Sequence, residues 1–506
     1  MLWIALHPPA LSLQAFAATL GSAQHALPLA LLDAHRIQAV NRVALQLGVK
    51  PGLKRATALA LAPQLLFGQA DATRDAQALH ALAHAALAFT PSVTLDGDGP
   101  VALPCVLLEL QSSLRYFGGL TALLQRLRAA LAPLGLRVRI ASAPTALGAA
   151  LLARWRSGFE QGAHSRELHA LQRQLDAVPL ALLGAAQSQA EALSGMGLRT
   201  LGDLRRLPRD GLARRCGEAL LDQLDRARGD RPDPREWLTP APTFEARLEL
   251  FERADSTAPL LHAAAVLLAR LVAWAGAQHA RIGAFVLAMH HERRHRAEAP
   301  AGEQTELTIA LAEASNDAKH LHTLLHERLA RLALPAPTLE LRLRCDQLVH
   351  RAAPNGELFP TAAGAQEGLL RLIERLQARL GPQRVCRVLR VEDHRPERAT
   401  AWQPALAAAA RVSAWPAAPT LTRPVWLLAD AQALGERASR PVLDGRPLQL
   451  LAGPERIETG WWDGAPAARD YFIAQAHDGA LVWIYRARLP LSPAAGEGWF
   501  LQGRFG

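Results

Sequence analysis

The chain begins with Met1-Leu-Trp-Ile-Ala-Leu-His-Pro-Pro-Ala-Leu-Ser-Leu-Gln14, and this stretch sets the fold of the N-terminal region. Its apolar run Leu2–Leu6 predicts a short strand. Pro8 and Pro9 predict a turn, after which Leu11–Gly21 has the residue spacing of a helix. This order of elements is typical of an α/β unit.

The alternation of strands and helices continues to about residue 160. Further elements are predicted from the spacing of apolar residues: strands at Val106–Gln111 and Val138–Ser142, and helices at Val40–Ala62, Asp71–Ala88 and Leu120–Ala132. Strands separated by helical segments in this order suit an α+β or α/β sheet domain over residues 1–160.

Composition and periodicity divide the rest of the chain into further parts, so we expect a multidomain α+β protein. The expected parts are short helices at 165–238, a second α+β domain at 244–348, an exposed loop at 351–366, a helix and an Ala/Pro-rich linker at 367–419, and a β-rich unit at 420–506. Within the fifth part, Gly368–Leu380 has the pattern of an amphipathic helix, and Ala401–Pro419 is expected to be flexible.

Composition and charge limit the possible classes of protein. The chain has 506 residues, half of them apolar, which is typical of a folded protein with more than one core. Its net charge of +10 suits a polyanionic partner such as nucleic acid. Only three of the 56 basic residues are lysines, so part of this charge reflects a compositional bias.

The cysteines and the N-terminal residues bear on the compartment. Cys105, Cys216, Cys345 and Cys386 lie far apart without a C-x-x-C pair, so we expect neither a disulfide framework nor a zinc knuckle. No basic region precedes the first apolar run, and we find no charge-free apolar stretch of about 18 residues. We therefore expect a cytoplasmic protein without a signal peptide or a transmembrane helix.

A Gly-x-Gly turn, Gly195-Met196-Gly197, lies between two amphipathic segments. In a helix–hairpin–helix, such a turn exposes backbone N–H groups that bind a DNA phosphate without reading the base sequence. Arg199 and Thr200 follow the turn and are candidates for the same contact. The alternative interpretation is a simple helix–helix turn without a ligand.

The run His291-Glu-Arg-Arg-His295 matches the H-E-x-x-H pattern of zinc hydrolases. It follows a strand-like segment and contains two adjacent arginines that would repel a dication. We therefore interpret it as a solvated, basic hairpin tip and expect no metal there. Arg293, Arg294 and Arg296 of this tip are candidate contacts to DNA phosphates.

The segment Pro354-Asn-Gly-Glu-Leu-Phe-Pro360 lacks helix or strand periodicity. Its Leu358 and Phe359 are apolar anchors in a polar loop, and together with Asn355 they resemble the Gln-Leu-x-Leu-Phe peptides that bind bacterial sliding clamps. Asn355 replaces the usual Gln, and Gly356 lacks the middle apolar contact. The alternative is a loop that packs against its own domain.

Large aromatic residues gather in the last part of the chain, and they include Trp461, Trp462, Tyr471, Trp483 and Tyr485. A β unit of about 80 residues needs large side chains to fill its core, so we interpret most of them as core residues. The alternative is an aromatic cage for a ligand.

Two segments in the first 120 residues resemble motifs of Y-family DNA polymerases. The opening stretch is similar to the first palm strand of that family, which carries an Asp-x-Asp-x-Phe pattern, and here Ala5 and His7 fill the two Asp positions. Ala102–Gly119 resembles the Ser-x-Asp-Glu stretch, with Pro104 and Cys105 in place of the acidic pair. Mg²⁺ is held mainly by carboxylate oxygens, and these four side chains supply none.

Other segments extend the resemblance over nearly the whole chain. Gly48–Leu53 is similar to a fingers motif that active members precede with a Tyr and an Arg that hold the incoming triphosphate. Arg42 and Leu45 stand at those places, and Leu45 cannot pair with phosphate oxygens. Three C-terminal segments resemble the region specific to the ImuB family, a catalytically degenerate branch of Y-family homologues: Gly453–Gly464, Arg469–Tyr471 and Trp499–Phe505.

The resemblance implies palm, fingers, thumb and little-finger domains followed by a partner-binding C-terminal unit. It also implies a non-catalytic, DNA-binding adaptor without a cofactor, located at the nucleoid. Such an adaptor would bridge a sliding clamp, an ImuA-type RecA-like protein and an error-prone replicative-type polymerase in damage-induced translesion synthesis. Two rival hypotheses are a polymerase that uses displaced acids (Asp96, Asp98 or Glu109) and a zinc hydrolase at His291–His295.

Overall fold

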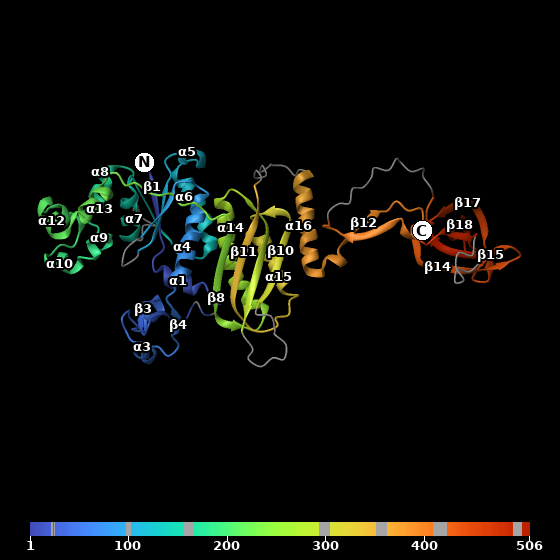
Figure 1. Ribbon diagram of the computed structural model, residues 1–506, viewed down its shortest axis with the longest axis horizontal. Helices are drawn as coiled ribbons and strands as arrows, with labels where there is room; N and C mark the ends of the chain where they lie inside the picture. Colours follow the sequence, from blue (N-terminus) through green and yellow to red (C-terminus); the bar gives the residue numbers. More distant parts are fainter. Residues whose placement is uncertain are drawn as a thin grey trace. The chain divides into compact units, whose positions relative to one another are not determined.

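A computed structural model describes residues 1–21, 24, 26–97, 103–155, 165–292, 304–350, 362–407, 422–488 and 498–506. The chain forms two compact units, Met1–Arg379 and Leu380–Gly506. The first unit mixes helices and strands, and the second is built mainly of strands (Figure 1). The expected α+β fold with a β-rich C-terminal part is confirmed.

The first sheet of unit 1 has the strand order β5-β6-β1-β7, and all neighbouring strands are antiparallel. Its strands are β1 (Trp3–His7), β5 (Val93–Asp96), β6 (Cys105–Glu109) and β7 (Arg139–Ala143). Every residue of β1 is buried, because helices cover both faces of the sheet. The three strands expected from the sequence are therefore present, and β5 is added at the edge.

Alternate residues of the first sheet face two different layers of helices. On one side, Ile4 and Leu6 pack in a core with α4 (Ala72–Leu87) and α6 (Leu120–Leu131). On the other side, Ala5 packs in a second core with α7 (Ala146–Trp155). Figure 1 shows α7 on one side of β1 and both α4 and α6 on the other.

A smaller sheet, β3-β2-β4, contains β2 (Leu29–Asp33), β3 (Arg36–Val40) and β4 (Leu66–Gln69). Helices α1 (Leu11–Ala17), α2 (Arg42–Gln46), α3 (Arg55–Leu61) and α5 (Leu114–Phe117) complete this half of the unit. The sequence analysis missed these strands, which are too short to show a clear alternation. The expected helical segment Val40–Ala62 is two short helices, and Val40 ends a strand.

Short helices follow as expected, and they extend the core beside α7. They are α8 (Leu168–Leu175), α9 (Gly184–Gln187), α10 (Ala190–Gly195), α11 (Leu201–Arg205), α12 (Arg209–Cys216) and α13 (Glu218–Arg228).

The second large sheet of unit 1 has the order β10-β9-β11-β8. Its strands are β8 (Phe244–Ala254), β9 (Arg281–His291), β10 (Gln304–Ser315) and β11 (Thr338–Val349), and α14 (Thr257–Ala277) and α15 (Ala318–Leu329) share a core with one of its faces. The sequence analysis missed β8. Its alternation of buried and exposed residues was nevertheless readable in Phe244–Leu248.

Helix α14 is long and apolar enough, by length and composition, to cross a membrane. Arg270 interrupts this segment, so it is not the charge-free apolar stretch sought in the sequence. Leu260, Leu267 and Trp274 of α14 are buried in the core beneath the second sheet, so the apolar composition of α14 serves that core. Helix α16 (Ala362–Leu380) ends at Leu380, the first residue of unit 2, and includes the expected helix Gly368–Leu380.

Unit 2 begins with a hairpin of β12 (Cys386–Arg390) and β13 (Thr400–Pro404). The prediction of a flexible linker over Ala401–Pro419 is therefore wrong for Ala401–Pro404, because these residues pair with β12.

A seven-stranded sheet follows in the order β16-β15-β14-β20-β19-β18-β17. Its strands are β14 (Trp426–Arg437), β15 (Arg440–Leu443), β16 (Arg446–Pro447), β17 (Gln449–Thr459), β18 (Ala467–Gln475), β19 (Leu481–Ala487) and β20 (Trp499–Arg504).

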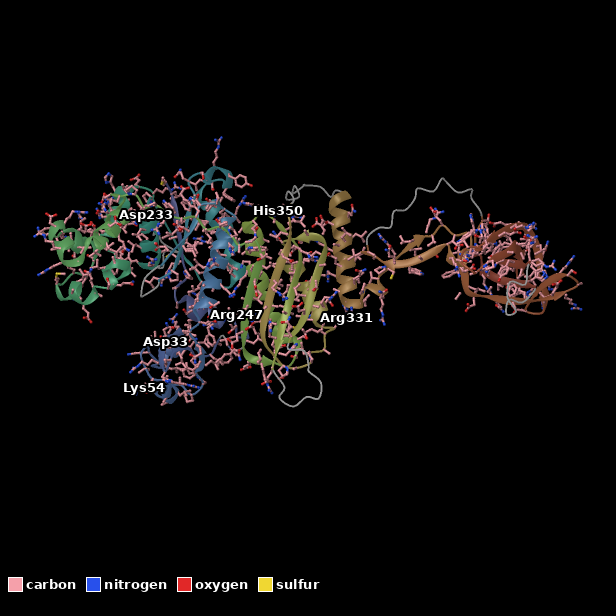
Figure 2. All side chains as sticks on the ribbon, in the orientation of Figure 1. Asp33, Lys54, Asp233, Arg247, Arg331 and His350 are labelled. Atoms are coloured by element: carbon pink, nitrogen blue, oxygen red, sulfur yellow. The ribbon has the colours of Figure 1, made fainter. Side chains whose placement is uncertain are left out.

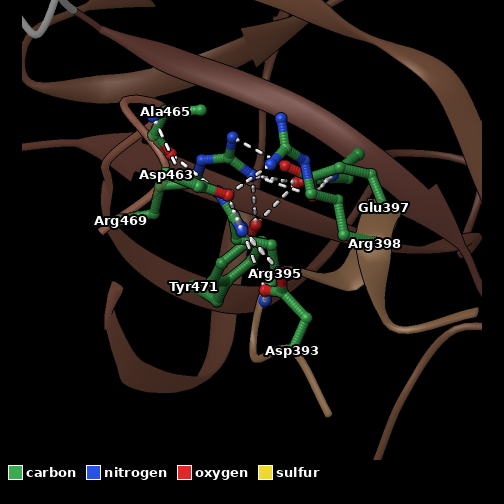
Figure 3. Close-up of polar contacts among 9 residues, drawn as sticks. Asp393, Arg395, Glu397, Arg398, Asp463, Ala465, Arg469 and Tyr471 are labelled. Carbon is green, nitrogen blue, oxygen red and sulfur yellow. Dashed lines mark hydrogen bonds and ion pairs between the residues drawn. The ribbon is translucent and has the colours of Figure 1, made fainter. Parts of the chain in front are cut away.

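An ionic network ties the hairpin of unit 2 to its sheet (Figure 3). The Arg395 guanidinium, only 4% exposed, binds Asp393 and Asp463 at 2.5 and 2.6 Å and donates to the Ala465 carbonyl at 2.8 Å. Hydrogen bonds from Arg395 and from the Ala465 N–H lower the pKa of Asp463 to about 2. The hairpin and the sheet therefore form one folded unit.

Candidate functional site

The structure brings together the four positions at which the polymerase resemblance places metal ligands. Ala5 and His7 belong to β1, and Cys105 begins the neighbouring strand β6 directly after Pro104. The pairing of Leu6 with Val106 sets Cys105 beside the end of β1. The His7 Nδ1 atom lies 2.9 Å from the Pro104 carbonyl oxygen, so the two segments are in contact at this point.

These side chains are buried and uncharged. Ala5 and Cys105 are fully buried, and burial raises the pKa of the Cys105 thiol to about 12. Burial also lowers the pKa of His7, and the charges of Arg154 and Arg139 lower it further. At neutral pH the site therefore presents a thiol and a neutral imidazole, and no carboxylate comes from these four positions.

An ion cluster lies beside this site, centred on Asp96 of β5, which pairs with Cys105 across the sheet. The Asp96 carboxylate binds Arg154 at 2.6 Å and Arg235 at 2.7 Å. Burial opposes ionisation of Asp96, but the two guanidinium groups hold its pKa below the usual value. Arg154 also donates to the Leu103 carbonyl at 2.8 Å, so the paired guanidinium is held next to the site.

Of the three acids of the rival polymerase hypothesis, the two that the structure describes, Asp96 and Glu109, do not converge. Asp96 is occupied by the two arginines, and Glu109 lies four residues beyond Cys105 on β6, a separation of about 13 Å along a strand. The Glu109 carboxylate accepts a hydrogen bond from the Gln111 N–H at 3.0 Å. Asp98 lies outside the described residues. Within the part of the chain that the structure describes, no group of three His, Cys, Asp or Glu side chains could hold a metal ion.

A cavity of ≈ 240 Å³ opens next to the ion cluster, between β5, α7 and the short helices. Asp96, Arg154, Asp233 and Arg235 line it, and they pair with one another. Asp233 is labelled in Figure 2. Because these charges are satisfied within the protein, the described lining of the cavity presents no free carboxylate to a metal ion.

The Gly-x-Gly turn is present at the end of α10, but its backbone N–H groups are already used. Those of Met196, Gly197 and Leu198 donate to carbonyls of α10, and those of Arg199 and Thr200 donate to the Asp203 carboxylate. The expected phosphate site on backbone N–H groups is therefore closed by Asp203, which forms a capping box with Thr200.

Near the Gly-x-Gly turn, exposed side chains rather than backbone N–H groups are able to bind a phosphate. Arg199 and Arg214 are exposed, and among the described residues their side chains form no hydrogen bond or ion pair. Arg215 is also exposed, and its guanidinium lies 3.5 Å from the Met196 sulfur. Arg199 was a candidate from the sequence, whereas Arg214 and Arg215 were missed, because only the fold brings α12 next to the turn.

The face of the second sheet opposite α14 carries both signs of charge. Arg247 of β8, labelled in Figure 2, lies across from Arg342 of β11. Arg342 binds Glu340, and Arg344 binds Glu306 of β10. The arginines on this face are thus largely matched by glutamates, and the face is not a positively charged patch.

The zinc-hydrolase hypothesis fails at His291, which is not part of a solvated tip. His291 is the last residue of β9 and is buried, with its two ring nitrogens 2.8 Å from the Thr305 hydroxyl and 3.2 Å from the Thr338 hydroxyl. His295 and the candidate DNA contacts Arg293, Arg294 and Arg296 lie outside the described residues. The candidate clamp residues Asn355, Leu358 and Phe359 also lie outside them.

The aromatic residues of unit 2 divide into a core and an exposed pair. Tyr471 and Trp483 are buried and stack with ring centroids 4.2 Å apart, which confirms the core interpretation for them. Trp461 and Trp462 are 75% and 59% exposed and meet edge to face at 4.6 Å. They directly precede Asp463, which Arg395 holds in place.

Comparisons with known proteins were made on the sequence and on the structure. No family model matches the sequence. The ImuB proteins of two Caulobacter vibrioides strains, NA1000/CB15N and ATCC 19089/CB 15, are each 30% identical to this chain over 485 residues, which cover 91% of this chain and 100% of the relative. A ternary complex of Dbh is similar over 69% of this chain and 99% of that chain, with 16% identity and a TM-score of 0.37. DinB from Sulfolobus solfataricus is similar over 69% and 100%, with 15% identity and a TM-score of 0.36.

Proposed function

The chain belongs to the ImuB family, and from this premise we propose that it is a non-catalytic, DNA-binding adaptor in damage-induced translesion DNA synthesis. In this proposal it acts in the cytoplasm at the nucleoid. It bridges a sliding clamp, an ImuA-type RecA-like protein and an error-prone replicative-type polymerase. The alignment with the ImuB proteins covers 91% of the chain at 30% identity, which supports a shared role for the whole protein rather than for one domain.

The proposed absence of catalysis rests mainly on the side chains at β1 and β6. Two-metal phosphoryl transfer needs carboxylates that converge on Mg²⁺. Ala5, His7, Pro104 and Cys105 offer none, and the Arg154 guanidinium lies beside them. The carboxylate of neighbouring Asp96 is held by two guanidinium groups, so it is not free to bind a metal ion.

Primer extension tests this part of the proposal. The full-length protein should add no nucleotide to a primed template with Mg²⁺ or Mn²⁺, while an active Y-family polymerase in the same buffer extends the primer. Incorporation that survives repurification would contradict the proposal. If Asp96→Asn or Glu109→Gln then abolished that incorporation, the displaced-acid hypothesis would be correct.

DNA binding is supported by the net charge of +10 and by the exposed, unpaired side chains of Arg199 and Arg214. Affinity for primer–template DNA should fall steeply with salt, because phosphate contacts release counterions. Arg199→Glu/Arg214→Glu should weaken binding about tenfold at low salt and reduce the salt slope by roughly two. Arg437→Glu/Arg440→Glu changes the charge equally in unit 2 and serves as the matched control. A flat salt response would remove the electrostatic basis of the proposal.

Clamp binding is proposed for the segment around Leu358 and Phe359. Replacing both with Ala should abolish recovery of the sliding clamp in a pull-down with the purified protein, since the two side chains are the apolar anchors of the peptide. Pro354→Ala, just outside the anchors, is the control. Unchanged recovery with the double variant would place the clamp contact elsewhere.

A further inference from the structure

Helix α16 docks onto unit 1 through a side that carries buried polar groups, with Leu370 and Ile373 half-buried at its margin. The Glu374 carboxylate lies 2.8 Å from the His320 Nε2 atom of α15, and both partners are buried. Glu374 also accepts a hydrogen bond from the Ala312 N–H of β10. Arg371 binds Asp317 at 3.1 Å. Among the described residues of α16, only Ala378 belongs to the apolar core of the unit.

A row of leucines on α16 faces away from the unit. Four leucines at spacings of three, four and four residues are between 38% and 56% exposed: Leu369, Leu372, Leu376 and Leu380. At 100° per residue they form one stripe on the side of the helix opposite Glu374 and Ala378. Single exposed leucines are common, but a row of four along three turns is a surface that another apolar surface would cover.

A basic edge runs along this leucine stripe. Arg375 and Arg379 are one turn apart on the same side of the stripe, and both are exposed. Among the described residues neither forms an ion pair, whereas Arg371 on the docked side is paired with both Asp317 and Glu367. The stripe therefore has the layout of one half of a helix pair, with a core seam and a charged flank.

We propose that α16 is a docking site for an amphipathic helix of a partner protein, with a leucine-type stripe flanked by acidic residues that pair with Arg375 and Arg379. In naming a partner surface the proposal rests on the adaptor role, but it does not depend on the absence of catalysis. A negative result here would leave the primer-extension and DNA-binding predictions untouched.

A second copy of this chain fits the surface less well. In a parallel pair of α16 helices, the arginine edge of one helix would face the Gln366 and Gln377 edge of the other. In an antiparallel pair, Arg375 and Arg379 would face their own counterparts, which is repulsive. Neither arrangement supplies a carboxylate, so the charge pattern favours an acidic partner helix.

Two synthetic helical peptides test the proposal on the full-length protein. Both carry leucines at the three-four-four spacing of α16, one with glutamates and the other with lysines along the flank. The Glu peptide should bind at least about tenfold more tightly than the Lys peptide in fluorescence anisotropy, because only it complements the basic edge. Arg375→Glu/Arg379→Glu should reverse this preference.

Replacing leucines of the stripe separates the apolar contribution. Leu372→Ala/Leu376→Ala should weaken binding of the Glu peptide about tenfold or more, since it removes the centre of the stripe. Leu450→Ala/Leu451→Ala removes two exposed leucines of β17 and should leave binding unchanged. Circular dichroism confirms that each variant is folded.

Three results would overturn the proposal. The first is that neither peptide binds, which means that the stripe is covered within the full chain. The second is equal affinity for the Glu and Lys peptides, which means that the basic edge plays no part. The third is a concentration-dependent dimer in sedimentation that Leu372→Ala/Leu376→Ala abolishes, which makes a second copy the occupant.

Discussion

Helices α14 and α16 have similar lengths, 21 and 19 residues, but they place their apolar residues in opposite ways. Helix α14 buries leucines and Trp274 between the second sheet and α4, and its one charged residue, Arg270, donates to Gln77 of α4. Helix α16 docks through Glu374 and exposes four leucines. Apolar residues in the first helix hold the unit together, whereas the four leucines of the second are exposed.

The largest effect is expected at Trp274, which is 1% exposed and donates its indole N–H to the Ala241 carbonyl. Trp274→Ala should lower the free energy of unfolding by roughly 3–5 kcal/mol, because it leaves a large cavity and leaves the Ala241 carbonyl with only the hydrogen bond from Gln278. Chemical denaturation measures the loss. Trp402→Ala, at a tryptophan that is 74% exposed, should change stability by less than about 0.5 kcal/mol. A small loss at Trp274 would mean that α14 is not a core helix.

A smaller effect is expected where α16 is docked. Glu374→Ala should cost about 2 kcal/mol, because the buried His320 ring and the Ala312 N–H both lose their partner. Amide hydrogen exchange in α16 should rise at the same time. Exposed Glu436 provides the control substitution. If Glu374→Ala left the exchange of α16 unchanged, the helix would be held by contacts other than the polar ones.

Acid should weaken the packing of α4 against α14. Burial, together with the charge of His80, lowers the pKa of His84 on α4 to about 4. In the unfolded chain His84 becomes protonated as the pH falls below about 6.5, whereas in the folded chain it stays neutral until about pH 4. The part of the folding free energy that depends on neutral His84 is therefore fully present above pH 6.5 and is lost as the pH falls toward 4. We expect a loss of about 2 kcal/mol between pH 7 and pH 5. His84→Gln should reduce this pH dependence, while His35→Gln, at an exposed site, should not.

The smallest effect on stability is expected at the exposed stripe. Leu372→Ala and Leu376→Ala should each change the free energy of unfolding by less than about 0.5 kcal/mol. The same change at fully buried Leu267 of α14 should cost at least about 2 kcal/mol. Comparable losses at both places would show that the stripe is buried in the full chain, and the contrast between the two helices would disappear.

Much of the fold could be predicted from the sequence because local patterns specify it. The strands β1, β6 and β7 and the helices α4 and α6 lie within a few residues of their predicted ranges. The short strands β2 to β4 gave no usable periodicity, and β8 was overlooked although its alternation is clear. The side of α16 that docks could not be predicted, because it depends on a contact between Glu374 and His320, which is 54 residues away.

The candidate site shows the same division between local and distant information. The register of β1 and β6 brings Ala5, His7, Pro104 and Cys105 together, as the resemblance implied. The ion pair of Asp96 with Arg154 joins residues 58 positions apart in the sequence, and no sequence motif predicts it. The closure of the Gly-x-Gly turn by Asp203 was partly readable, since Thr200 and Asp203 have the spacing of a capping box.

The bond from Arg395 to Asp463 determines where the C-terminal unit can be cut. A fragment that starts at residue 420, where the composition of the chain changes, would retain Asp463 without the guanidinium that fixes it. The loop bearing Trp461 and Trp462 would then lose its anchor, and Glu397 would no longer meet Arg469. A fragment that starts at Leu380 preserves the whole network, so binding studies on the isolated C-terminal region are best begun there.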